Sequence, residues 1–263
     1  MKIGLCTWSY NRSLASKKLT FESMISECAK KLRIGGIDII ADFLPKTDKK
    51  YLTGIKKLAT DLQLTICCLS PGNNFGQESQ AARDKEVEGI KKWIEVAYIL
   101  GAPVVRIFAG WPPAGKAQEL WQPMVESIRK CIPPAQEAGV SLAIEHHNGG
   151  GYLPSSIETL KLIKQIDSPW VGINLDTGNY QDADIYQAIE DSIVYAPHIH
   201  AKIHQITKDG VEQEFDYDKI FTIFKKADYR GFVSVEYEGK EDELEYVPIS
   251  IEMLKRYAAK YEI

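Results

Sequence analysis

An apolar segment that ends abruptly in polar residues lies in the middle of the chain, over residues 139–151. Val140, Leu142 and Ile144 alternate with polar or small residues, so Glu145 and His147 fall on the opposite face of the strand that this pattern predicts. Buried parallel strands are normally apolar on both faces. A carboxylate and an imidazole at the end of such a strand therefore indicate either a buried ion pair or a functional site.

Apolar strand patterns alternate with amphipathic helix patterns along the whole chain. Glycine, proline or a capping side chain separates each segment from the next. The pattern predicts strands over residues 3–8, 37–41, 64–69, 103–108, 139–145, 171–176, 198–203 and 232–237. Helices are expected over residues 20–34, 48–61, 83–100, 116–138, 155–166, 182–195, 216–227 and 242–261. We expect Pro133 and Pro134 to break or kink the fourth helix.

Eight alternating strand and helix units in 263 residues have the size of an α/β fold of the single (β/α)8 type, the TIM barrel. No Gly/Ser linker or low-complexity segment divides the sequence, so residues 1–263 are expected to form a single barrel domain. A doubly wound sheet is the alternative. It is disfavoured because no G-x-G-x-x-G or G-x-x-x-x-G-K-[ST] motif follows a predicted strand.

Metal-type ligands stand near the ends of four successive predicted strands, at Glu145, Asp176, His200 and Glu236. The active sites of (β/α)8 barrels lie at the C-terminal ends of the strands, so we expect these side chains to converge. Three carboxylates and one imidazole form an oxygen-rich set that suits Mn²⁺ or Mg²⁺, and less specifically Zn²⁺, Co²⁺ or Fe²⁺.

Two basic residues on the predicted strands offer a metal-free alternative. Three converging carboxylates repel one another unless a cation lies among them. Arg106 and Lys202 could supply that charge in place of a metal. The residues by themselves leave both arrangements open.

Charge and cysteine content limit the classes of partner. The formal net charge is −4 and no basic stripe is present, which disfavours nucleic acid. No apolar run reaches the roughly 20 residues of a membrane span. The first residues lack a signal-peptide core, and the five cysteines are odd in number without metal-type spacing, so we expect reduced thiols and a cytoplasmic protein. The side chains of Cys67 and Cys68 are expected on opposite faces of their strand.

Five short motifs give nearly the whole chain a resemblance to a known family. They are Val-Val-Arg106-Ile-Phe-Ala-Gly110, Ala-Ile-Glu145-His-His147, Asn-Leu-Asp176-Thr-Gly, His-Ile-His200-Ala-Lys202 and Val-Glu236-Tyr-Glu. Together they resemble the xylose isomerase-like barrels, specifically the sugar phosphate isomerase/epimerase group. That group includes ketose 3-epimerases, hydroxypyruvate isomerase and inosose dehydratase.

The resemblance implies roles for individual residues. It implies that a divalent metal is held by Glu145, Asp176, His200 and Glu236, with no organic cofactor. It also implies proton transfer beside the carbonyl of a small sugar or sugar-like ketone through an enediolate, with Glu145 and Glu236 as acid and base. Positions that line the substrate site in relatives are matched by Arg106, His147 and Lys202.

Other residues bear on the substrate. Trp8 and Trp111 fall at or just after the C-terminal ends of predicted strands and could pack on a sugar ring. Asn179, which we also expect in the substrate site, stands where many relatives have His, and Ile203 where many have Asp. These departures leave the sugar and its phosphate open, and they argue against an endonuclease IV-like enzyme.

We therefore expect a metal-dependent sugar isomerase or epimerase that acts on a small carbohydrate. A lyase of the inosose dehydratase type, working on the same enediolate, is one alternative. A non-catalytic sugar-binding barrel is the other. The sequence is compatible with a homo-oligomer.

Overall fold

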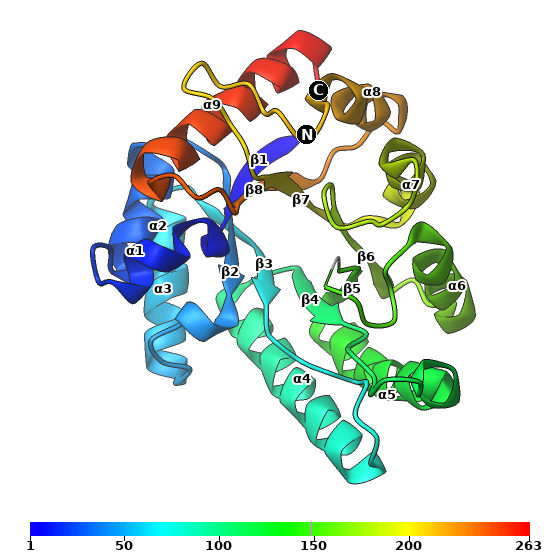
Figure 1. Ribbon diagram of the computed structural model, residues 1–263. Helices are drawn as coiled ribbons and strands as arrows, with labels where there is room; N and C mark the ends of the chain where they lie inside the picture. Colours follow the sequence, from blue (N-terminus) through cyan, green and yellow to red (C-terminus); the bar gives the residue numbers. More distant parts are fainter. Residues whose placement is uncertain (148) are drawn as a thin grey trace.

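The computed structural model describes residues 1–147 and 149–263, and within them eight parallel strands close into a barrel in the order β1 to β8 (Figure 1). The strands are β1 (Lys2–Cys6), β2 (Gly36–Ile40), β3 (Thr65–Ser70), β4 (Val104–Phe108), β5 (Ser141–Glu145), β6 (Val171–Asp176), β7 (His198–Ile203) and β8 (Phe232–Tyr237). Pairing of β1 with β8 closes the sheet. The predicted (β/α)8 barrel is confirmed.

Helices surround the barrel (Figure 1). They are α1 (Asn11–Ala15), α2 (Phe21–Lys30), α3 (Lys49–Asp61), α4 (Gln80–Leu100), α5 (Ala117–Ala138), α6 (Ser156–Ile166), α7 (Ile185–Ser192), α8 (Tyr217–Lys226) and α9 (Glu243–Tyr261), with short 3-10 turns η1 (Thr7–Tyr10), η2 (Ala41–Phe43) and η3 (Ile193–Tyr195). Side-chain caps start several of them where expected: Thr20 and Ser23 form a capping box on α2, and Asp48 caps α3. None of the described helices is long and apolar enough to cross a membrane.

The first strand is shorter than predicted, because residues 7–10 leave it as η1. Thr7 Oγ1 accepts a hydrogen bond from the Ile40 amide at 2.8 Å. Ser9 Oγ donates to the Val235 carbonyl at 3.0 Å and accepts from the Tyr237 amide at 2.9 Å. These bonds replace strand pairing and place Trp8 beyond the end of the sheet.

Of the two outcomes expected at Pro133 and Pro134, a break does not occur, because α5 runs through them to Ala138. Each proline lacks an amide hydrogen, so the carbonyls of Arg129 and Lys130 lose their usual partners within the helix. Both of those residues are exposed, so water can serve their carbonyls.

A register shift between β2 and β3 changes the direction of one cysteine. Ile37 pairs with Ile66, but the next residue, Asp38, pairs with Cys68. The extra residue, Cys67, lies 3.9 Å from Ser234 Oγ on β8, while Cys68 Sγ lies 3.6 Å from Ser70 Oγ. Both thiols therefore point into the barrel, and the prediction that they face opposite sides is wrong. In the described part of the chain all five cysteines are free.

Candidate functional site

The C-terminal ends of β5 to β8 bring Glu145, Asp176, His200 and Glu236 together. Each offers one ligand atom, and these atoms all lie within 4.8 Å of one another. All four residues are buried. Parallel pairing sets their level in the barrel, since Asp176 is in register with His200. Strand alternation directs them to the inside, as the polar faces of the sequence predict.

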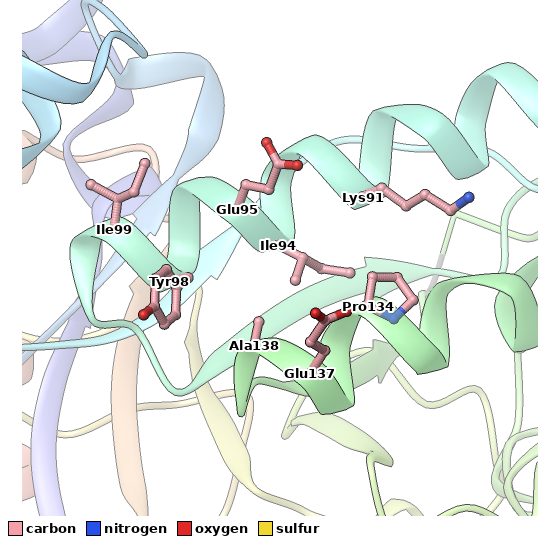
Figure 2. Close-up of a pocket in the computed structure, with 8 residues that line it drawn as sticks. All are labelled: Lys91, Ile94, Glu95, Tyr98, Ile99, Pro134, Glu137 and Ala138. Carbon is pink, nitrogen blue, oxygen red and sulfur yellow. The ribbon is translucent and has the colours of Figure 1, made fainter.

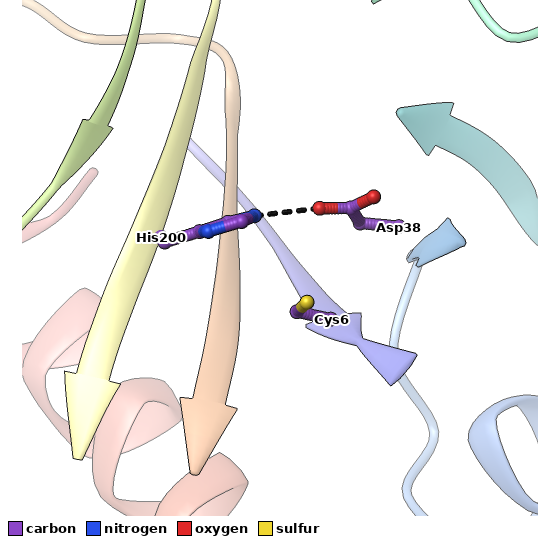
Figure 3. A group of neighbouring side chains, drawn as sticks. All are labelled: Cys6, Asp38 and His200. Carbon is purple, nitrogen blue, oxygen red and sulfur yellow. Dashed lines mark hydrogen bonds and ion pairs between the residues drawn. The ribbon is translucent and has the colours of Figure 1, made fainter. Parts of the chain in front are cut away.

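His200 lies between carboxylates on both sides of its ring. Its Nε2 is 2.6 Å from Asp38 Oδ2, and its Nδ1 is 2.9 Å from Glu145 Oε1 and 3.5 Å from Glu236 Oε1. Figure 3 shows Asp38 and His200 joined across the barrel, with Cys6 beside them. Burial alone would lower the pKa of His200, but Glu236, Cys6, Glu145 and the hydrogen bond with Asp38 together hold that pKa well above its ordinary value.

Sequence reasoning missed Asp38. Its signal was a single carboxylate within the apolar run Ile37-Asp-Ile-Ile of β2. The residue is fully buried, and its Oδ1 accepts a hydrogen bond from Ser70 Oγ at 2.8 Å. Asp38 thus fixes the orientation of the His200 ring from the side opposite Glu145.

Both cations proposed for a metal-free arrangement do contact the carboxylates. Lys202 Nζ lies 2.5 Å from Glu236 Oε2, 3.1 Å from Asp176 Oδ2 and 3.1 Å from Glu238 Oε2. Arg106 Nε lies 3.2 Å from Glu145 Oε2. Burial would lower the pKa of Lys202, but the three carboxylates outweigh it and raise that pKa well above the ordinary value.

These cations do not balance the acidic side chains. Within the described residues, two cations, Arg106 and Lys202, face four carboxylates, which belong to Asp38, Glu145, Asp176 and Glu236. Glu238 is left out of this count because it also pairs with His204, and His200 is neutral when it binds a metal. Two negative charges remain in excess. A divalent cation carries the charge that would neutralise them.

Asp176 marks where that excess is greatest. Its Oδ2 has no hydrogen-bond partner among the described residues, although Lys202 lies at ion-pair distance. Burial raises the pKa of Asp176 well above its ordinary value; Lys202 opposes the shift, and Glu236 and Glu145 add to it. A buried carboxylate oxygen that makes an ion pair but no hydrogen bond within the described residues, beside two other carboxylates, fits a metal ligand.

A cavity of about 240 Å³ opens onto this cluster. Of the residues expected in the substrate site, five line it: Trp8, Arg106, His147, Asn179 and Lys202. The cavity wall also includes residues that the sequence did not single out for the site, namely Asp42, Ser70 and Glu238. The sequence could have predicted the direction of Glu238, because it lies two residues after Glu236 and alternation therefore puts both side chains on the same face.

Trp111 does not line this cavity. Its ring packs edge-on against Phe108 and His147, with centroids 5.0 Å and 5.4 Å apart, and borders a small adjoining space. Trp111 therefore packs behind Phe108 and His147, which line the cavity. Trp8 stands at the rim with 39% of its surface exposed and stacks on Phe43.

Asn179 and His147 are held by the backbone around β5. Asn179 Nδ2 donates to the His146 carbonyl at 3.3 Å, and His147 Nδ1 accepts from the Gly149 amide at 2.8 Å. His146 itself is buried, stacks on Tyr180, and accepts the Asp176 amide hydrogen at its Nε2. This neighbour of His147 therefore belongs to the support of Asp176 and does not line the cavity.

A different groove, of about 630 Å³, lies on the outside of the barrel between α4 and α5 (Figure 2). Its walls include Ile94 and Tyr98 from α4 and Pro134 from α5. None of its described lining residues comes from a strand end. The chemistry-bearing residues all lie in the barrel mouth, so the smaller cavity is the candidate site.

Comparison with known proteins gives the same architecture. The family model described as "Xylose isomerase-like TIM barrel" matches residues 27–257. A solved structure of D-psicose 3-epimerase in the presence of D-fructose superposes with a TM-score of 0.81 at 17% identity, covering 98% of this chain and 99% of that one. At that identity the likeness shows the fold.

Two curated relatives are similar in sequence. The 2-oxo-tetronate isomerase of Pectobacterium atrosepticum is 26% identical over 183 residues, which cover 65% of this chain and 70% of the isomerase. The inosose dehydratase of Bacillus thuringiensis (strain Al Hakam) is 25% identical over 144 residues, which cover 46% of this chain and 48% of the dehydratase.

Proposed function

Since the chain belongs to the xylose isomerase-like TIM barrel family, we propose that it is a divalent-metal-dependent isomerase or epimerase of a small sugar or sugar-like ketone. The observation that carries the proposal is the cluster of four buried ligand atoms, all within 4.8 Å of one another, that opens onto the cavity in the barrel mouth. Relatives that are named as sugar isomerases and epimerases support the reaction class.

In this proposal Glu145, Asp176, His200 and Glu236 hold the metal, Mn²⁺ or Mg²⁺ above all because the set is rich in oxygen. The excess negative charge supports such a site, as does Asp176 Oδ2, which makes no hydrogen bond within the described residues. A bound divalent cation would supply Lewis acidity toward the substrate carbonyl and so stabilise negative charge that develops on its oxygen.

Glu145 and Glu236 are the proposed acid and base. They come from β5 and β8, which are not neighbours in the barrel, so they approach the cavity from different strands. Burial would raise the pKa of Glu236, but Lys202 and His200 outweigh it and hold that pKa below its ordinary value. Glu236 is therefore unprotonated at neutral pH and can accept a proton from the carbon beside the carbonyl.

The remaining cavity residues would bind and orient the sugar. Arg106 and Lys202 place charged donors beside the two proposed catalytic carboxylates. Asn179 and His147 offer polar atoms on the cavity wall. Trp8, at the rim, offers an aromatic face on which a sugar ring can pack.

A dehydratase is the second candidate, favoured by the similarity to the inosose dehydratase of Bacillus thuringiensis. Removal of the same proton would then be followed by loss of a hydroxyl group from the next carbon as water. Product analysis separates the two reactions, because elimination gives a conjugated product that absorbs in the ultraviolet whereas epimerisation does not.

The test is exchange of the carbon-bound proton with deuterated solvent, followed by NMR over a panel of ketoses and inososes in buffer with Mn²⁺ or Mg²⁺. We expect exchange with the wild type and its loss in Glu145→Gln and Glu236→Gln. Glu137→Gln, at an exposed position on α5, is the matched control and should keep full activity. If a sugar binds but its carbon-bound proton does not exchange, the enzyme hypothesis is rejected in favour of a non-catalytic sugar-binding barrel.

A further inference from the structure

A second hollow, of about 700 Å³, adjoins the candidate active site at the β7 and β8 ends of the barrel. Its walls are the segment 204–214, which follows β7, and the segment 237–246, which follows β8. Glu238 lines both this hollow and the cavity over the ligand cluster. The two spaces therefore share a wall at that residue.

The β7 side of the hollow is a small, well-bonded hairpin. Ile206 and Glu212 form an antiparallel bridge. The Gln213 amide donates to the Gln205 carbonyl at 2.9 Å, and the Thr207 amide donates to the Val211 carbonyl at 2.9 Å. These bonds hold the wall in one shape, so the hollow is formed before any ligand arrives.

The backbone amides at the base of this hairpin donate hydrogen bonds to a side-chain carboxylate, that of Glu212. Glu212 is buried, and its Oε1 accepts from the amides of His204 and Gln205 at 3.2 Å and 2.8 Å. Its Oε2 accepts from the amides of Glu214 and Phe215 at 2.6 Å and 2.7 Å. In (β/α)8 enzymes the loops after strands 7 and 8 frequently supply a phosphate site. Here the backbone amide donors of the loop after β7 already bind the carboxylate of Glu212.

The charge around the hollow also opposes an anion. Glu214, Glu238 and Glu241 line it, against Lys240 and His204. Glu238 is paired with Lys202 at 3.1 Å on the cavity side and with His204 at 3.4 Å on the other. Since His204 also contacts Glu214 at 3.0 Å, its positive charge is already engaged, and the three carboxylates outnumber the Lys240 ammonium.

The other lining groups suit a neutral polyol. Gln205, Thr207 and Gln213 carry uncharged donors and acceptors, and Tyr246 adds an aromatic ring. Sugars are commonly held by this combination of polar groups and aromatic faces, which matches hydroxyl groups with hydrogen bonds and ring faces with apolar contact.

We propose that the second hollow is a subsite for the distal, hydroxylated and unphosphorylated part of a substrate longer than one sugar ring. The reacting ketone would lie over the ligand cluster, and the rest of the molecule would extend past Glu238 between the β7 and β8 loops. This inference rests on the proposed function for its chemistry, and it names the substrate class: a ketose or keto-sugar that carries a glycosidic extension.

The experiment compares substrates of one and two rings. Deuterium exchange is measured for D-fructose, D-fructose 6-phosphate and the glucosyl-fructose disaccharides turanose, maltulose, leucrose and isomaltulose. We expect at least one disaccharide to exceed D-fructose by about tenfold or more in kcat/KM, and the phosphate to fall below D-fructose. Gln213→Trp, which fills the hollow, should remove the advantage of the disaccharide and leave D-fructose unchanged. Gln136→Trp, on the exposed side of α5, is the control.

Equal kcat/KM for one and two rings, no effect of Gln213→Trp, or a preference for the phosphate would overturn the subsite. Calorimetric titration with the same sugars separates this failure from that of the proposed function, because it measures binding without turnover. Tighter disaccharide binding that Gln213→Trp abolishes, in the absence of any exchange, would retain the subsite and reject the isomerase. Exchange of D-fructose without any preference for a disaccharide would retain the isomerase and reject the subsite.

Discussion

Asp38 on β2 and His200 on β7 meet inside the barrel, with Oδ2 and Nε2 2.6 Å apart, although 162 positions separate them in the sequence. The other ring nitrogen of His200 faces Glu145 at 2.9 Å. A carboxylate behind a ligating histidine fixes the tautomer and direction of the ring and raises its basicity as a ligand. Asp38 is thus a positioning residue for the proposed metal site.

The first prediction concerns this pair. Asp38→Asn should weaken metal binding by about 10- to 100-fold, because the ring loses the negative charge that orients and polarises it. Competition with a fluorescent chelator measures the affinity. Asp61→Asn, at an exposed position on α3, is the control and should bind metal like the wild type. Equal affinity in Asp38→Asn would show that the contact only packs the barrel interior.

Metal should stabilise the fold through Asp176. A ligand at one hundred times its Kd adds about 2.7 kcal/mol to the free energy of unfolding, which for a chain of this size raises Tm by roughly 5 to 10 °C. We expect this rise when Mn²⁺ is added to chelator-treated wild type, and no rise in Asp176→Asn. Differential scanning calorimetry measures both. A metal-dependent rise in the variant would remove Asp176 from the ligand set.

Lys202 should contribute strongly to the stability of the metal-free fold. Its ammonium is buried against Asp176, Glu236 and Glu238, so Lys202→Met removes the one cation that these three carboxylates share within the described residues. Breaking a buried pair in this way costs roughly 3 to 5 kcal/mol. Urea unfolding in the presence of a chelator measures the loss.

Lys226→Met provides the matched control, since that lysine is exposed on α8 and its ion pair with Glu190 is its only one among the described residues. Its loss should leave the free energy of unfolding nearly unchanged. If Lys202→Met were equally mild, the three carboxylates would have to be protonated or otherwise neutralised in the folded protein.

His204 gives a pH dependence whose direction follows from its neighbours. The hydrogen bond with Glu238 raises the pKa of His204; burial opposes the shift, Glu214 adds to it, and the charge of Lys202 opposes it. A group whose pKa is raised on folding stabilises the protein fully below its unfolded pKa of about 6.5, and the gain disappears as the pH rises through the folded value.

We therefore expect wild type to exceed His204→Gln in free energy of unfolding by more at about pH 5.5 than at about pH 8.5. Urea unfolding at both values, with chelator present, measures the difference. Glu214→Gln should reduce the contrast, because it removes one of the two carboxylates that favour the charged imidazole. Parallel stability profiles for wild type and His204→Gln would contradict the assignment.

Local patterns in the sequence determined the fold and the direction of the ligand side chains. Alternation along each strand decided which residues share a face, and the spacing of the β/α units put Glu145, Asp176, His200 and Glu236 at successive strand ends. Both properties repeat within one strand or one β/α unit, so they can be read without knowing how distant segments meet.

Contacts across the barrel were decided only by the tertiary structure. The register of β2 and β3 turned Cys67 inward, and side-chain bonds to β2 and β8 ended β1 before Trp8. Closure of the sheet brought Asp38 to His200, and the hairpin after β7 wrapped its amides around Glu212. Periodicity fixes which way a side chain points, but its partner depends on how distant strands are staggered when the barrel closes.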